Sequence, residues 1–339
     1  MGFRGRSAPI GARTFMLAAF AAALVGAGSA QAQQPQTSQA PPWPARQNTI
    51  VIGFGAGSSA DLLTRIIAEG LRRRTGATFI VENKPGAGGN LSVDQVVKSP
   101  ADGSVMLASI FAPIIVNPMT MNVTYDAFKQ LQPVTIMGTT PSVLVSSKKL
   151  GVTNVAQLSE LVKANPGKYT YSSVGLGTIG HLSMEMLADQ VGSKMVHVPF
   201  RSTPESLNAV VQGEVDVATV ALGTVEPHIN ADAVISLAIT SSQRWPSLPN
   251  VPTVAEAGIP DMPVDAWCAL FLPAGVPKPI VERIYNEVKA VIDDPDTQKR
   301  IMNVFYRPSG IPTEQFNKML HAEVGQWRPI LDKLGLLKK

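Results

Sequence analysis

Strand and helix patterns alternate along this chain from residue 48 onward, and this alternation limits the possible folds more than any other feature. Short β-branched runs at residues 49–54, 78–82 and 104–110 predict buried strands. Leucines and isoleucines recur at helical spacing after the first run, and a glycine-rich turn at residues 85–89 opens a second helix. Strands joined by helices in this order lie parallel in one sheet, with helices on its faces. We therefore expect an α/β fold.

A second unit of the same kind begins near residue 150. Thr153 is expected to cap a helix that ends before Pro166, and Thr203 to begin another with a proline at its first position. The strands of this unit are expected at residues 168–173, 194–198, 215–222 and 233–240. Helices at residues 279–292 and from Thr313 close the pattern. The sequence thus predicts two lobes around a cleft, each a mixed sheet with flanking helices.

The N-terminus has the pattern of a secretory signal peptide. Three arginines within the first 13 residues precede the apolar run 14–28, and Ala30 and Ala32 form an A-x-A cleavage site. The apolar run is shorter than the roughly 20 residues that span a bilayer. We therefore expect residues 1–32 to be removed, residues 33–46 to form a flexible leader, and the mature protein to lie in the periplasm.

Charge and cysteine content exclude several partners. The formal net charge of the chain is +4, but residues 1–32 hold three arginines and no acid, so the mature chain is nearly neutral. A nucleic-acid partner therefore has no electrostatic support. The single cysteine, Cys268, cannot form an internal disulfide and is expected to pack in the core.

Most signatures of catalysis are missing. Residues 55–60 fit the G-x-G-x-x-A pattern of a dinucleotide-binding turn, and Glu82 ends the next strand. Exported proteins rarely meet free nicotinamide cofactor, so an oxidoreductase is kept only as a lesser alternative. The sequence has no G-x-S-x-G, H-E-x-x-H or C-x-x-C motif, and its four histidines lack metal-ligand spacing. We expect a binding protein that is not an enzyme, with no cofactor and no metal.

Three loops end at helix N-termini, at residues 55–61, 174–178 and 200–203. Unpaired backbone N–H groups and the positive end of the helix dipole make such positions anion sites. Glycines in the first two loops let a carboxylate approach the backbone, and serine and threonine add hydroxyl donors. Each loop alone is equally explained as a helix cap, since Ser58 and Asp61 fit a capping box. Three such loops in two lobes favour a shared site in the cleft.

Several motifs occur in an order that identifies a family. They are VENKPGAGGN at residues 81–90, ADG at 101–103, GTIGHL at 177–182, HVPF at 197–200, QGEVDV at 212–217 and PNVPTVAEAGIP at 249–260. Over essentially the whole mature chain, the sequence resembles the solute-binding receptors of tripartite tricarboxylate transporters, the Bug receptors.

The resemblance implies a two-lobed, type II-like periplasmic binding protein that closes on its ligand like a flytrap. Such a protein captures a small organic carboxylate and delivers it to separate membrane transporter subunits of the tripartite tricarboxylate type. We expect a monomer, with residues 47–145 and 270–339 in lobe 1 and residues 146–269 in lobe 2. A ligand-sensing subunit for a membrane signalling partner is the alternative role.

The resemblance places ligand contacts in the loop after the first strand and in a facing loop of the other lobe. With the third helix start and the end of the strand near residue 219, the candidate ligand-binding residues are Phe54, Gly55, Ala56, Gly57, Ser58, Ser59, Asp61, Ser173, Val174, Gly175, Leu176, Gly177, Thr178, His181, Ser202, Thr203, Thr219 and Val220.

Several of these residues depart from the family pattern, among them Ala56, Ser58 and Thr219, and two departures bear on the ligand. Leu176 stands where relatives often have a polar residue, and Val220 stands where they often have an acid. An ammonium group in such a cleft would lose water without gaining a partner. The sequence therefore predicts an apolar cleft that prefers a non-amino carboxylate.

Overall fold

The computed structural model describes residue 2, residues 43–260, residue 262 and residues 265–338. The expected signal peptide (apart from residue 2) and most of the expected leader lie outside these residues. Within the described ranges, no helix is long and apolar enough to cross a membrane.

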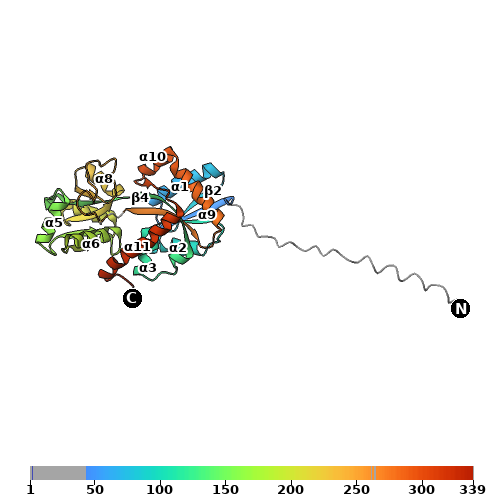
Figure 1. The fold of residues 1–339 in the computed structure, drawn as a ribbon, viewed down its shortest axis with the longest axis horizontal. Coiled ribbons are helices and arrows are strands. Elements are labelled where there is room, and N and C mark those ends of the chain that lie inside the picture. The colour runs from blue at the N-terminus through green and yellow to red at the C-terminus, as the bar shows by residue number, and fades with distance from the viewer. Residues whose placement is uncertain (1, 3–42, 261, 263–264, 339) are drawn as a thin grey trace. The chain divides into compact units, whose positions relative to one another are not determined.

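The first sheet has six strands in the order β11-β4-β10-β3-β1-β2 (Figure 1). They are β1 (Gln47–Ile52), β2 (Thr78–Asn83), β3 (Val105–Ile110), β4 (Leu131–Thr140), β10 (Ala266–Pro273) and β11 (Arg307–Pro308). β1 pairs in parallel with both β2 and β3, which confirms the parallel arrangement predicted for the first unit. β10 is antiparallel to β3 and to β4, so the sheet is mixed.

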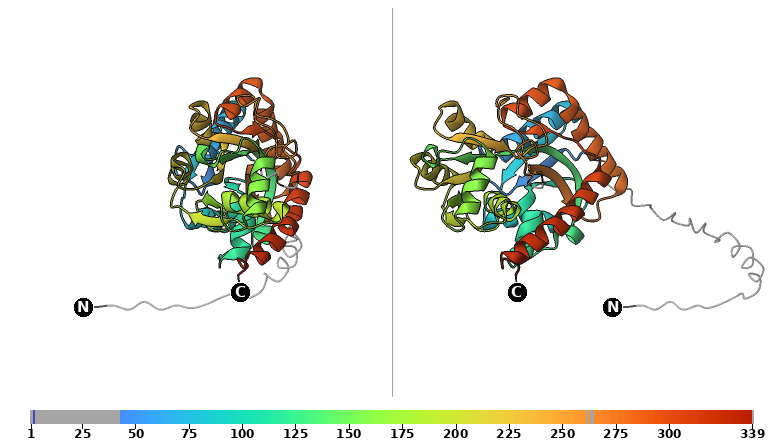
Figure 2. Two further views of the ribbon diagram at one scale, coloured as in Figure 1. Left: turned by 90° about the vertical axis from the view of Figure 1, so that its left-hand side faces the viewer. Right: turned by 60° about the vertical axis from the view of Figure 1, so that its left-hand side comes forward.

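Helices cover both faces of this sheet (Figures 1 and 2). One face carries α1 (Ser59–Thr75), α9 (Lys278–Asp293) and α10 (Pro295–Asn303). The other carries α2 (Asn90–Val97), the π-helix η2 (Ala112–Val116) and α11 (Thr313–Lys333). The short elements η1 (Ala87–Gly89), α3 (Asn117–Thr120) and α4 (Ala127–Gln130) lie in the connections. Alternate side chains of the strands enter two separate cores, so the arrangement is a three-layer α/β/α sandwich.

The second sheet has the order β7-β6-β8-β5-β9. Its strands are β5 (Ser142–Ser146), β6 (Thr170–Ser173), β7 (Val196–Pro199), β8 (Val217–Ala221) and β9 (Ile235–Ile239). Its helices are α5 (Val155–Ala164), α6 (Ile179–Val191), α7 (Thr203–Gln212) and α8 (Leu222–Asn230), with the single turn η3 (Lys148–Leu150). β7, β6 and β8 run parallel, whereas β5 is antiparallel to β8 and β9. α5 and α6 pack on one face, and α7 and α8 on the other.

The chain passes between the two sheets at Pro141 and again between β9 and β10. The crossing segments are bonded to each other, because the amide of Ser142 donates to Thr240 Oγ1 at 2.9 Å and the amide of Thr240 donates to the Ser142 carbonyl at 2.9 Å. The sheets also share packing, since Leu182 and Met186 of α6 lie in a core cluster of the first sheet. The lobe boundaries given above fall a few residues after these crossings and stay a prediction.

Two helix caps differ from the sequence prediction by one residue. α5 is capped by Asn154, whose side chain accepts from the amide of Gln157 at 2.9 Å. The Gln157 side chain accepts in return from the amide of Thr153 at 2.8 Å, which draws Thr153 outside the helix. α7 is capped by Ser202 in place of Thr203.

The contact between α1 and α9 depends on Gly70. A Cβ atom at this position would lie 2.3 Å from Val291 Cγ1. We expect Gly70→Ala to lower the free energy of unfolding by about 1–3 kcal/mol. Val291→Ala in the same chain should restore part of the loss, which a double-mutant cycle in urea measures.

Gly325→Ala is the matched control, because Gly325 also lies inside a helix but has open space around it. This change should be neutral or stabilise by up to about 1 kcal/mol through helix propensity. A Gly70→Ala protein as stable as the parent would contradict the close helix contact.

Candidate ligand-binding site

The first candidate loop connects β1 to α1. Gly57 has a φ of 83°, a left-handed conformation that favours glycine. Ser58 is the N-cap of α1, and its hydroxyl accepts from the amide of Asp61 at 3.3 Å. Phe54 is half-buried against the core, whereas Gly55, Ala56 and Ser59 are exposed at the tip of the loop. The loop therefore presents backbone and small side chains outward.

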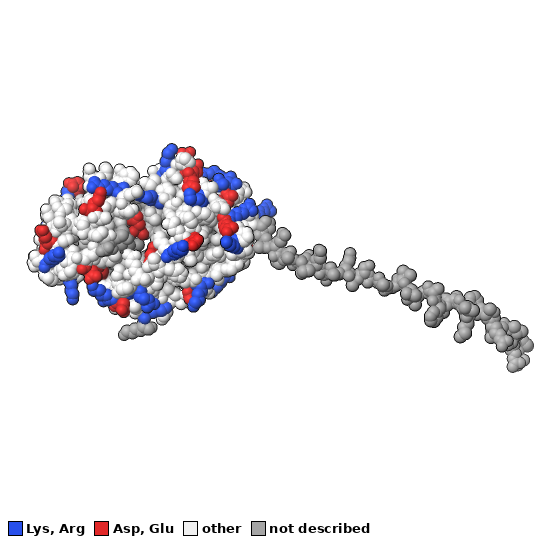
Figure 3. Space-filling view, in the orientation of Figure 1, with Lys and Arg blue, Asp and Glu red and all other residues white. Residues whose placement is uncertain are grey.

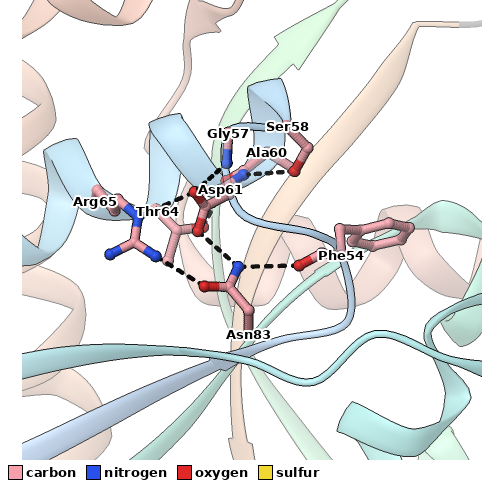
Figure 4. A network of polar contacts seen from close by, with 8 residues as sticks. All are labelled: Phe54, Gly57, Ser58, Ala60, Asp61, Thr64, Arg65 and Asn83. Carbon is pink, nitrogen blue, oxygen red and sulfur yellow. Dashed lines mark hydrogen bonds and ion pairs between the residues drawn. The ribbon is translucent and has the colours of Figure 1, made fainter.

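Asp61 holds this loop from inside. Its carboxylate is only 1% exposed and accepts from Gly57 N at 2.9 Å, Arg65 Nε at 3.0 Å and Asn83 Nδ2 at 2.8 Å (Figure 4). Burial alone would raise the pKa of Asp61, but hydrogen bonds from Arg65, Gly57 and Asn83 hold it below its ordinary value. The expected capping box is altered, because the carboxylate bonds to Gly57 and not to Ser58. Both carboxylate oxygens of Asp61 are therefore engaged by protein donors.

The second candidate loop connects β6 to α6. Ser173 Oγ accepts from the amide of Gly175 at 3.1 Å and donates to the Gly175 carbonyl at 3.1 Å. Thr178 Oγ1 donates to the same carbonyl at 2.7 Å. Gly177 has a φ of 75°, and its amide donates to His181 Nδ1 at 3.2 Å. Val174 is 39% and Leu176 65% exposed, so the outer surface of this loop is apolar.

Both loops fix a glycine by the same type of hydrogen bond. In each, the amide of a left-handed glycine donates to a side chain four residues later, in the first turn of the following helix. The acceptor is the carboxylate of Asp61 in one lobe and the imidazole of His181 in the other. We expected these glycines to let a carboxylate approach the backbone amides closely. The amides of Gly57 and Gly177 are already occupied by protein acceptors.

The first two amides of α1 and the first three amides of α6 make no hydrogen bond with the described residues. They are those of Ser59 and Ala60 in α1, and those of Ile179, Gly180 and His181 in α6. Thr178 is the N-cap of α6, yet its side chain bonds within the loop and leaves the helix start uncapped. Such first-turn amides, aligned with the helix dipole, are donors for an anion.

The π-helix η2 lies beside the second loop and beside Gly89, and the sequence prediction missed it. A Cβ atom on Gly89 would lie 3.4 Å from the Phe54 ring and 2.7 Å from Pro113 Cγ. A Cβ atom on Gly177 would lie 3.4 Å from Val116 Cγ1. The second loop therefore lies against η2, and the first loop is connected to η2 through Gly89. Single π-turns often mark functional sites, but an apolar run of this kind has no pattern that identifies one.

The remaining candidate residues lie at the start of α7 and in β8, in the part of the chain that forms the second sheet. Ser202 caps α7 through the amide of Glu205, and Thr203 follows it at the start of the helix. Thr219 Oγ1 contacts the Met184 sulfur at 3.2 Å. Val220 is 3% exposed and packs in the core between β8, α7 and α8. The expectation that Val220 makes the cleft apolar therefore loses its basis, because the side chain faces the core; Leu176 and Val174 provide the exposed apolar surface.

A small cavity of about 40 Å³ lies where the sheets adjoin. It is lined by Phe111, Ile179, Asp265, Trp267, Glu323, Gln326 and Trp327. Two of these groups are carboxyl groups that burial makes less acidic. Desolvation raises the pKa of Asp265 to about 6 against a hydrogen bond from Thr240 and the charge of Arg307. It raises the pKa of Glu323 to about 7 against a hydrogen bond from Trp267 Nε1.

Charged side chains are interspersed on the surface drawn in Figure 3, with no large area of one sign. Among the residues that the structure describes, no group of three or more His, Cys, Asp and Glu side chains gathers as it would around a metal ion. The only charged side chain in the two loops is the buried Asp61, so no cation of these segments is available to meet an anion.

Comparison with known proteins gives the family. Residues 63–336 match the family described as the tripartite tricarboxylate transporter family receptor. The chain belongs to this family. The receptor is 32% identical over 290 residues to the UPF0065 protein in the tcbD-tcbE intergenic region of Pseudomonas sp. (strain P51), covering 85% of this chain and 86% of that protein.

Two solved structures extend the likeness. The first, R. palustris Rpa4515 with adipate, has 29% identity and a TM-score of 0.74, covering 87% of the receptor and 99% of that chain. The second, MatC (Rpa3494) from Rhodopseudomonas palustris with bound malate, has 25% identity and a TM-score of 0.70, covering 85% and 100%. The receptor thus has the two-lobed α/β architecture of periplasmic solute-binding proteins, which confirms the predicted fold class.

The raised pKa of Glu323 makes stability depend on pH. The folded protein favours the protonated acid, so this contribution is complete below about pH 4.5 and is lost as pH rises through about 7. Glu323→Gln removes the buried charge and keeps an acceptor for Trp267. We expect the variant to unfold at a higher temperature than the parent at pH 8, and at a similar temperature at pH 4.5. The rise of the Glu323 pKa from 4.5 to about 7 corresponds to roughly 3 kcal/mol, an upper limit here.

Glu314→Gln serves as the control, because Glu314 is exposed on the same helix, where a hydrogen bond from Lys318 and its charge lower the pKa. This change should bring no gain at pH 8. Melting curves for parent and Glu323→Gln that stay parallel from pH 4.5 to 8 would refute the assignment.

Proposed function

We propose that this receptor captures one small organic carboxylate between residues 54–61 and residues 173–181 and passes it to membrane transporter subunits. It acts in the periplasm after residues 1–32 are removed, and it does not transform its ligand. The observation that carries the proposal is the pair of helix starts with unbonded first-turn amides, one after β1 and one after β6. The likeness to structures that hold adipate and malate supports a carboxylate as the ligand class.

The chemistry of the two loops favours a carboxylate over other ligands. Neither segment contains lysine or arginine, so a negative ligand would be met by backbone amides and hydroxyl groups. Ser59 and the amides of Ser59 and Ala60 face it from α1, and the first-turn amides face it from α6. The exposed Leu176 and Val174 would cover an apolar part of the same molecule.

The lesser alternatives have weaker support. In a dinucleotide-binding protein the acid that ends the second strand would accept from the ribose. Here the Glu82 carboxylate accepts from Gln95 Nε2 at 3.2 Å, so it is engaged inside the protein. A sensing subunit would bind the same ligand through the same loops, and only its membrane partner would differ.

Calorimetry with adipate, malate, succinate and aspartate tests the proposal. We expect saturable binding at about 1:1 for at least one compound, accompanied by a rise in melting temperature, because a ligand of the native state stabilises it. Gly57→Val and Gly177→Val should each weaken binding at least about tenfold, since a branched residue is strained at positive φ and would displace the loop.

Gly192→Val is the matched control, because Gly192 has a φ of 69° at the far end of α6 with open space around it. It should lose stability but not affinity. Absence of saturable binding across the panel would count against the proposed function, and parent-like binding by both loop variants would remove the loops from the site.

The ligand should lack an amino group. With Asp61 satisfied by three donors, these segments offer no free carboxylate to an ammonium, whose burial without a partner is costly. We expect succinate to outrank aspartate by about tenfold or more in direct competition. A preference for aspartate of that size would reverse the conclusion and restore Asp61 as a ligand contact.

A further inference from the structure

Two histidines lie directly beneath the second loop. His181 belongs to the first turn of α6 and is 3% exposed, and His197 belongs to β7. Their ring centroids are 4.6 Å apart, and Tyr171 stacks on His197 at 4.9 Å with an interplanar angle of 19°. The Tyr171 hydroxyl donates to Glu185. The rings are therefore held in place by packing with each other and with β6.

Each imidazole is connected by hydrogen bonds to one glycine of the loop, His181 directly and His197 through Ser173. His181 Nδ1 accepts directly from the amide of Gly177 at 3.2 Å. His197 Nε2 lies 2.7 Å from Ser173 Oγ, which in turn is bonded to both the amide and the carbonyl of Gly175. Gly175 and Gly177 both have positive φ, so the pair of rings supports the two most unusual backbone positions of this loop.

The hydrogen bonds fix the state of one ring nitrogen. An amide can only donate, so Nδ1 of His181 carries no proton. The Ser173 hydroxyl accepts from the Gly175 amide and has a single hydrogen, which either the Gly175 carbonyl or His197 Nε2 accepts, so the direction of the Ser173–His197 bond depends on the tautomer of His197. Burial, with the neighbouring His197, lowers the pKa of His181 to about 4, which is consistent with a neutral ring.

We propose that His181 and His197 are positioning residues of the ligand site: they hold Gly175 and Gly177 so that the unbonded first-turn amides of α6 face the ligand. This inference rests on the proposed function. It assigns His181 a different role from the direct contact suggested by the sequence, because its ring is buried and its one bonded nitrogen faces the loop. It also adds His197, which the list of candidate residues did not contain.

Two kinds of replacement distinguish a loop held by hydrogen bonds to the histidines from a loop supported only by packing against their rings. His181→Asn places a carbonyl oxygen near the position of Nδ1, and His197→Gln places a side-chain amide, which can donate or accept, near that of Nε2. His181→Phe and His197→Phe keep an aromatic ring but remove the nitrogen. His321→Phe is the matched control, because His321 is exposed on α11 and lies against Phe128 away from both loops.

The first measurement needs no ligand: amide hydrogen exchange of Gly175 and Gly177 by NMR at pH 7.5. We expect exchange at Gly177 to become at least about tenfold faster in His181→Phe and to stay near the parent rate in His181→Asn, since the amide loses or keeps its acceptor. Gly175 should respond in the same way to the His197 pair. Unchanged exchange in both phenylalanine variants overturns the inference.

The second measurement is calorimetric titration with adipate and with malate. The phenylalanine variants should bind about tenfold more weakly than the parent, and the asparagine and glutamine variants within about threefold. Faster exchange with unchanged affinity would also overturn the inference, because the loop would then be held for stability alone. If the parent protein binds neither compound, the proposed role in ligand binding is rejected. The exchange rates then still decide whether the histidines hold the loop.

Should His181→Phe fail to fold, His181→Leu takes its place with the same expected results. Melting temperatures close to that of the parent show that a loss of affinity is not a loss of folded protein.

Discussion

The packing on both faces of the first sheet depends on β10. This strand pairs with β3 on one side and with β4 on the other, and it comes after both in the chain. Its central side chains are almost fully buried. Cys268, Leu270 and Leu272 enter the core under α1 and α9, whereas Trp267 and Phe271 enter the core under α2 and α11. The strand therefore ties together segments that were separated by the whole second lobe.

The sequence predicts β1, β2 and β3 of the first sheet well, but it does not predict β4 and β10. β1, β2 and β3 are short apolar runs followed by strong helix signals, so local pattern and final pairing agree. β4 and β10 join only through contacts far apart in the chain, and no local signal tells where Trp267 and its neighbours insert. The π-helix η2 was missed for the same reason, since its apolar residues fit many structures.

The candidate site shows the same division between local and tertiary information. The helix starts at Ser58 and Ser202 follow from capping rules that operate within a few residues. Which amides remain free does not follow, because it depends on whether a side chain turns back to the loop. Asp61 and His181 do so from the same place in their helices, yet one is an acid and the other an imidazole, so a search for one residue type would not relate them.

The placement of α6 links the second loop to packing in the core of the other sheet. Leu182 and Met186 of this helix lie in a core cluster with Phe111 and Trp327 of the other sheet. A motion that pulls α6 away from this cluster would expose these side chains to water, at a cost of about 25 cal/mol for each Å² of apolar surface. The helix that supplies the first-turn amides of the second loop is therefore held by the core of the other sheet.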